Sequence, residues 1–65
     1  MNVTINGQSE RIVPGTIEAL VCRKGLQPEA LVVEHNQEVV PRERWSHIAL
    51  QEGDVLELLR FVGGG

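Results

Sequence analysis

The chain has 65 residues, and its nine acidic and six basic side chains give a net charge of −3. A chain of this length forms one small domain without a deep substrate cleft. The basic residues do not cluster as nucleic-acid binding requires, and no apolar run approaches the roughly 20 residues of a membrane-spanning helix. We therefore expect neither nucleic acid nor a membrane as a partner.

The first residues predict a β-hairpin. Apolar and polar residues alternate from Met1 to Asn6, a period of two that is typical of a strand with one buried face. Asn6-Gly7 suits a type I′ turn, in which both central residues have positive φ. We expect a second strand from about Ser9 to Val13.

A helix is predicted after the hairpin. Thr16 can cap its N-terminus, because a hydroxyl oxygen can accept a hydrogen bond from a free backbone amide. Gly25 ends it, because glycine readily takes the left-handed conformation that follows many helices. Between them, the apolar residues have the spacing of one helix face: Ile17, Leu20 and Val21.

Short strands are predicted in the middle of the chain. Ala30 to Val33 is an apolar run rich in β-branched residues, and Asn36-Gln37 predicts a turn before Val39-Val40. Residues 42–46 are expected to form an irregular turn, in which Trp45 anchors the segment to the core.

The last segment predicts a tight turn over residues 51–54 and a long strand from Val55 to Val62. The hairpin and this strand can form one sheet with the helix across it. The first and last strands would lie parallel in the middle, since the crossover between them is long enough. The expected fold is α+β, a β-grasp domain over residues 1–61 with a mixed sheet.

Side chains of the last strand predict a docking patch. Leu56 and Leu58 should face the helix, which places Leu59 and Phe61 on the opposite face of the sheet. Exposed apolar clusters often mark interfaces, so we expect Leu59, Phe61 and the adjacent Val62 to contact partners. The alternative is that Phe61 folds onto the domain.

The C-terminus is the candidate site. We expect residues 62–65 to be a flexible tail ending in a free carboxylate on Gly65, with Gly63 and Gly64 able to pass through a narrow channel. The tail would reach about 13 Å. A carboxylate must be activated before it reacts, for instance as an adenylate formed from ATP, and the chain has no phosphate-binding loop. We therefore expect a carrier or substrate of an enzyme, with a frayed terminus as the alternative.

Other side chains predict no metal site and no bound cofactor. Cys22 is the only cysteine, which excludes an internal disulfide and favours the cytoplasm. His35 and His47 lack the spacing of a metal pair and are expected at the surface. The carboxylates are expected to be solvated, with Asp54 bonding to nearby backbone in its turn.

Nearly the whole chain carries a combination of motifs. They are residues 33–36 (VEHN), 39–45 (VVPRERW), 52–54 (EGD) and 60–65 (RFVGGG). Together they resemble the ThiS family of sulfur carriers, which has the ubiquitin-like β-grasp fold. Many relatives have another residue in place of Gly63, so the essential positions are Gly64 and Gly65.

The resemblance implies a role in thiamine biosynthesis, as a carrier and not an enzyme. A ThiF-type adenylating enzyme would activate the Gly65 carboxylate with ATP, and sulfur supplied from cysteine by a cysteine desulfurase would convert it to a thiocarboxylate. A ThiG-type thiazole synthase would then take this sulfur into the thiazole ring. The resemblance requires no cysteine on the carrier, so Cys22 receives no role in sulfur transfer.

Three other functions remain open from the sequence. The small subunit of molybdopterin synthase also carries a thiocarboxylate on a β-grasp fold, but its usual proline-rich approach to the tail is missing here. A ubiquitin-like modifier would form amides with lysines on its targets. A plain interaction domain would keep its function after deletion of Gly64-Gly65.

Overall fold

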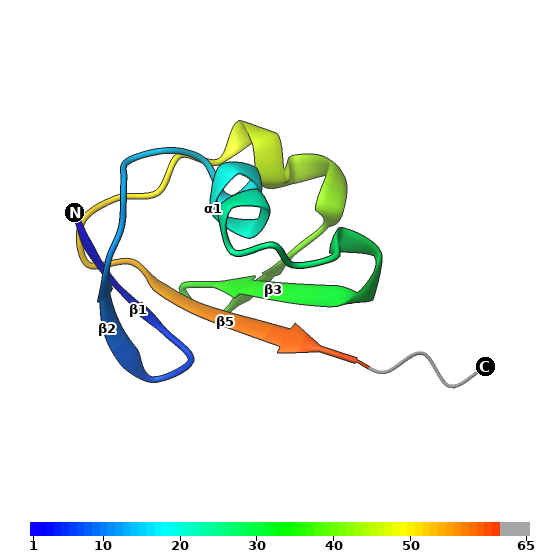
Figure 1. Cartoon of the computed structure of the whole chain (residues 1–65), viewed down its shortest axis with the longest axis horizontal. Coiled ribbons are helices and arrows are strands. Elements are labelled where there is room, and N and C mark those ends of the chain that lie inside the picture. The colour runs from blue at the N-terminus through cyan, green and yellow to red at the C-terminus, as the bar shows by residue number, and fades with distance from the viewer. Residues whose placement is uncertain (62–65) are drawn as a thin grey trace.

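A five-stranded sheet with one α-helix across it forms the protein, as Figure 1 shows for the computed structural model. The structure describes residues 1–61. The helical elements are α1 (Ile17–Arg23) and two 3₁₀ helices, η1 (Pro28–Ala30) and η2 (Arg42–His47). The strands are β1 (Asn2–Ile5), β2 (Gln8–Arg11), β3 (Leu31–His35), β4 (Glu38–Val40) and β5 (Val55–Arg60).

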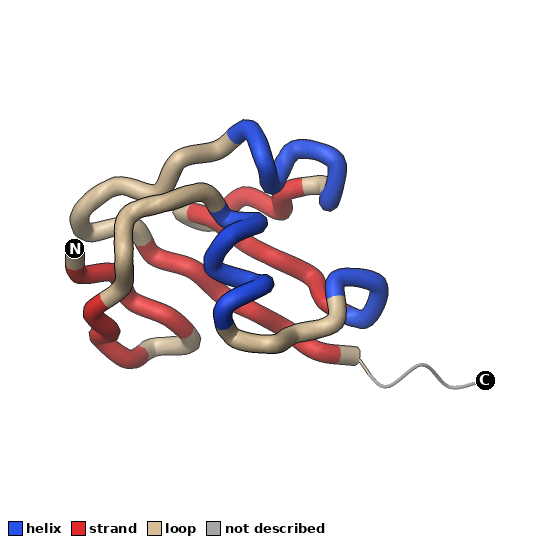
Figure 2. The backbone as a smooth tube through the Cα atoms, turned by 45° about the horizontal axis from the view of Figure 1, so that its top comes forward, coloured by secondary structure: helices blue, strands red, loops and turns tan. Residues whose placement is uncertain are grey.

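The strands lie in the order β2-β1-β5-β3-β4. β1 and β5 are parallel neighbours near the middle of the sheet, and the other pairs are antiparallel. The predicted α+β fold with a mixed sheet is therefore confirmed. Figure 2 shows α1 running across one side of the sheet, which leaves the other side open.

The first hairpin has the predicted turn. Asn6 and Gly7 have φ values of 51° and 83°, as a type I′ turn requires. The Asn6 side chain also reaches β5, where its Oδ1 accepts a hydrogen bond from the Leu58 amide at 2.8 Å. Its Nδ2 donates to the Leu58 carbonyl at 3.3 Å. The turn is thus tied to the central strand, a contact that the sequence did not predict.

The helix begins and ends at the predicted residues. The Thr16 Oγ1 accepts a hydrogen bond from the Ala19 amide at 3.1 Å, which satisfies one free donor of the first turn. Gly25 follows the helix with a φ of 69°, and the Leu26 amide donates back to the Val21 carbonyl at 3.2 Å. These contacts turn the chain back toward the sheet.

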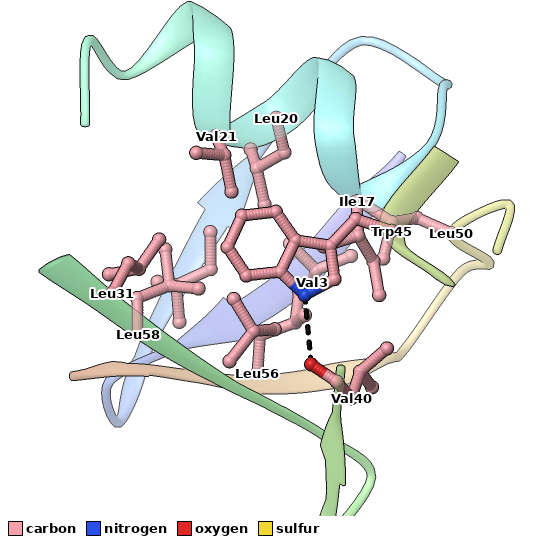
Figure 3. Packing of buried hydrophobic residues seen from close by; sticks show 12 residues of the cluster. Val3, Ile17, Leu20, Val21, Leu31, Val40, Trp45, Leu50, Leu56 and Leu58 are labelled. Carbon is pink, nitrogen blue, oxygen red and sulfur yellow. Dashed lines mark hydrogen bonds between the residues drawn. The ribbon is translucent and has the colours of Figure 1, made fainter. Parts of the chain in front are cut away.

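Trp45 anchors the segment between β4 and β5, as predicted. Its ring is 2% exposed, and its Nε1 donates to the Val40 carbonyl at 2.9 Å. In Figure 3 the ring lies in the middle of the core cluster. The cluster has twelve buried members: Val3, Ile5, Ile17, Leu20, Val21, Leu31, Val33, Val40, Trp45, Leu50, Leu56 and Leu58.

The second strand was expected from about Ser9 to Val13 but spans Gln8–Arg11. Two later elements also differ from their predictions. Residues 42–46 were expected to be irregular, but they belong to η2, which begins with a hydrogen bond from the Arg44 amide to the Pro41 carbonyl at 2.9 Å. The last strand ends at Arg60 and not at Val62, because its partner β3 begins at Leu31, the residue opposite Arg60. Val62 lies outside the described residues.

Asp54 is the centre of a polar cluster that corrects the expectation of solvated side chains. It is only 9% exposed, and its Oδ2 accepts hydrogen bonds from the Gln51 amide at 2.9 Å and from His35 Nε2 at 2.8 Å. Its Oδ1 accepts from Asn36 Nδ2 at 3.2 Å. Asn36 Oδ1 in turn accepts from the Val55 amide at 2.9 Å. The predicted local turn bond is present, and the cluster also joins the β3–β4 turn to the start of β5.

Burial raises the pKa of Asp54. The opposing effects are larger: hydrogen bonds from His35, Gln51 and Asn36, and the charge of His35, all lower this pKa. The net pKa of Asp54 therefore lies below its ordinary value. A carboxyl group with a lowered pKa stabilises the fold above its unfolded-state pKa, and this contribution is lost as the pH falls through the folded-state pKa. Asp54 therefore favours folding at neutral pH.

We expect Asp54→Asn to lower the free energy of unfolding at pH 7 by about 1–3 kcal/mol, because one acceptor oxygen is replaced by a donor in a buried cluster. The difference from the wild type should shrink as the pH falls below about 4, where Asp54 of the unfolded chain binds a proton, and it should be lost once the pH falls through the lower folded-state pKa. Urea unfolding between pH 3 and 7 measures both effects. Glu18→Gln, at an exposed position of α1, is the control, and a difference that stays constant with pH would contradict the assignment.

The β3–β4 turn contains a second testable feature. Asn36 and Gln37 have φ values of 50° and 74°, and the left-handed region costs a residue with a Cβ about 1–2 kcal/mol. We expect Gln37→Gly to raise the free energy of unfolding by about 0.5 kcal/mol, after the entropy cost of glycine. Gln27→Gly, at a φ of −89°, should instead lower it. Thermal unfolding of both variants gives the comparison, and a destabilised Gln37→Gly would refute the explanation.

Candidate functional site

The path to the candidate tail begins in the middle of the sheet. β5 is paired with β1 on one side and with β3 on the other. After β5, the Phe61 amide donates to the Ala30 carbonyl at 3.1 Å, which holds the last described residue against the end of η1. The predicted site residues Val62, Gly63, Gly64 and Gly65 lie outside the described residues.

The open face of the sheet carries the predicted docking residues. Leu59 is 48% exposed and Phe61 is 50% exposed, whereas the neighbouring Leu58 is 7% exposed and packs in the core. Leu59 therefore lies on the face away from α1, as predicted. Phe61 is half exposed, so it is not part of the buried core, but this value does not decide between a docking residue and the alternative that its side chain folds onto the domain. Docking of a partner at Leu59, Phe61 and Val62 stays a prediction.

The register of β3 with β4 and β5 places further apolar residues on the open face, which the sequence did not predict. Val32 on β3 lies opposite Leu59, so it shares the open face and is half-buried there. Val39 on β4 lies opposite Glu34 and is 64% exposed, and Val55 at the start of β5 is 44% exposed. The sequence predicted residues 30–33 only as an apolar run, and it did not show which residues of neighbouring strands are partners. The open face is therefore more apolar than predicted.

The other side of the molecule has a shallow hollow of about 290 Å³ between β2 and α1. Its charged rim includes an ion pair between Lys24 Nζ and Glu10 Oε1 at 2.6 Å. Cys22, on α1, is exposed. Within residues 1–61, no group of three or more potential metal-ligating side chains comes together.

The described helices include none with the length and apolar character that crossing a membrane requires. His35 is not the surface residue that the sequence predicted, because it bonds to Asp54 and its side chain is 19% exposed. His47 is exposed, as expected. The described part of the chain therefore offers an exposed apolar face and a central strand that runs toward the C-terminus.

A mixed five-stranded sheet with parallel strands near its middle and one helix across it is the ubiquitin-like β-grasp fold. The model of the ThiS family matches residues 3–65, which is nearly the whole chain. The chain belongs to the ThiS family.

Individual relatives agree with this assignment. A crystal structure of the thiamine biosynthesis protein ThiS from Geobacter metallireducens is similar over the full length of both chains, with a TM-score of 0.86 and 33% identity. The sulfur carrier protein ThiS of Bacillus subtilis is 39% identical over 51 residues, which cover 78% of this chain and 77% of that protein.

A thiazole synthase of Paramagnetospirillum magneticum is 36% identical over 66 aligned residues, which cover all of this chain and 20% of that protein. A second thiazole synthase, from Magnetococcus marinus, matches over the same share of its length. The chain thus spans about a fifth of the length of the thiazole synthases that it matches.

Proposed function

We propose that this chain is a sulfur carrier for thiazole formation in thiamine biosynthesis, with Gly65 as the residue that carries the sulfur. The observation that carries the proposal is the match to the ThiS family over residues 3–65, which includes the terminal glycines. The relatives named as sulfur carriers and as a thiamine biosynthesis protein support it. The carrier acts as a co-substrate of its partners and not as an enzyme.

The proposed chemistry takes place on the Gly65 carboxylate. A ThiF-type enzyme binds ATP and transfers AMP to the carboxylate with release of pyrophosphate, which makes the acyl carbon electrophilic. The cysteine desulfurase takes sulfur from cysteine as a persulfide, and this persulfide attacks the acyl carbon and displaces AMP to form an acyl disulfide. A thiol then reduces the S–S bond, which releases the thiocarboxylate and leaves the oxidised thiol as a disulfide. The carrier itself binds no cofactor in this scheme. Cys22 takes no part in it, and its free thiol suits the proposed cytoplasmic location.

The acceptor of the sulfur is proposed to be a ThiG-type thiazole synthase. The two thiazole synthases that match this chain contain a similar region within proteins about five times as long. The presence of a carrier-like region and a synthase in one polypeptide supports direct contact between the carrier and the synthase. We propose that this chain makes the same contact with a thiazole synthase.

We propose that the docking surface and the reacting group lie in different parts of the chain: the docking patch is Leu59, Phe61 and Val62, and the chemistry takes place at Gly65. Four residues at roughly 3.3 Å each give Gly65 a reach of about 13 Å beyond Phe61. An enzyme that acts on Gly65 must therefore cover the end of β5. Leu59, Phe61 and Val62 are the apolar residues nearest to that end in sequence, which supports them as the docking patch.

The direct test is the intact mass of the chain after incubation with ATP, a ThiF-type enzyme, a cysteine desulfurase and cysteine. We expect a gain equal to the replacement of one oxygen by sulfur. The gain should be absent without ATP and in a chain that lacks Gly65. If enzymes that are active on a known carrier leave the mass unchanged, the proposed function is wrong.

The docking patch has its own test, because it concerns affinity and not chemistry. Leu59→Ala and Phe61→Ala should each weaken binding to the adenylating enzyme about tenfold, as expected for apolar anchors of an interface. Both positions are exposed, so unfolding free energies should change by less than about 1 kcal/mol. Val13→Ala, at a residue that is 55% exposed beside the hollow on the helix side, is the matched control. Unchanged affinity in both patch variants would exclude the patch.

A further inference from the structure

Two glutamates lie directly opposite each other on the open face of the sheet. Glu34 on β3 is the cross-strand partner of Glu57 on β5. Their chain neighbours Val33 and Leu58 are also cross-strand partners, and both are buried in the core under α1. Because successive side chains of a strand point to opposite faces, the two carboxylates point away from α1. Side chains at such positions have Cβ atoms about 5 Å apart, and like charges there destabilise the sheet. Both glutamates are half-buried.

The described part of the chain does not neutralise this pair. The two ion pairs found within residues 1–61 are Lys24–Glu10 and His35–Asp54. Arg11 lies on the edge strand β2, which β1 separates from β5. Arg60 lies opposite the buried Leu31, on the α1 side of the sheet. The other basic residues are in α1, just after it, or in η2: Arg23, Lys24, Arg42 and Arg44.

Apolar side chains surround the glutamate pair. Toward the C-terminal end of β5, the next pair on the same face is Val32 and Leu59. On β4, the strand on the other side of β3, Val39 is the cross-strand partner of Glu34. Val55 lies two residues before Glu57 and completes the frame. A partner that covers these side chains removes water from around the two carboxylates, which strengthens any attraction to a cation.

We propose that the adenylating partner inserts an arginine side chain between Glu34 and Glu57. This inference rests on the proposed function and deepens it, because the pair is continuous through Val32 and Leu59 with the docking patch beside the tail. A guanidinium group fits best, since its planar set of five donors can bond to two carboxylates at once. Binding then relieves the repulsion that the free chain carries, and it selects a partner with a cation at that position.

The inference predicts opposite changes in stability and in affinity. Glu34→Gln and Glu57→Gln should each raise the midpoint of thermal unfolding, by about 2–4 °C, because the like-charge contact is removed. The same variants should bind the adenylating enzyme about tenfold more weakly. Their affinity should also depend less on salt than that of the wild type, because a charge contact is lost.

Glu18→Gln makes the same change of net charge at an exposed position of α1, on the other side of the sheet. It should leave the affinity unchanged. Glutamate variants that bind as tightly as the wild type, or a control that weakens binding equally, would overturn the inference. If either result is found and the wild-type chain still gains sulfur in the mass experiment, only this inference is wrong and the proposed function stands. A wild-type chain that gains no sulfur would overturn both.

Discussion

The pairing of β5 on both of its edges is the constraint on which the rest of the structure depends. Parallel pairing with β1 requires a long crossover, and the crossover contains the helix that covers one face. Antiparallel pairing with β3 then brings the middle of the chain beside its end. Leu56, which is fully buried, lies where these contacts meet. The sheet, the core and the exit of the C-terminus all follow from the position of one strand.

Local signals predicted the elements that local contacts form. Asn6-Gly7 specified its turn, and the Thr16 cap and Gly25 specified the helix, because each acts within a few residues. The 3₁₀ helix η2 and the Asp54 cluster were not predicted. Asp54 meets His35 and Asn36 across 18 or 19 residues of sequence, and only the folded chain brings such groups together.

In the candidate site, too, local features were predicted and contacts between distant parts of the chain were not. Period-two alternation was sufficient to predict that Leu59 is exposed, but not that Val32 lies beside it or that Glu34 faces Glu57, because register depends on how strands align. The role of Gly65 rests on the terminal glycines and the family resemblance, and it stays a prediction. Membership in the ThiS family favours thiazole formation over the molybdopterin-synthase and protein-modifier alternatives.

The position of β5 between two partners also has a mechanical consequence. A force applied at the C-terminal end of β5 would act along the axis of this strand. The hydrogen bonds to β3 lie across that axis, and those to β1 are slanted to it. Such a pull loads the bonds in shear, so they share the force instead of opening one after another from an end. Pairing on both edges therefore places β5 in the geometry that best resists a force applied at its C-terminal end.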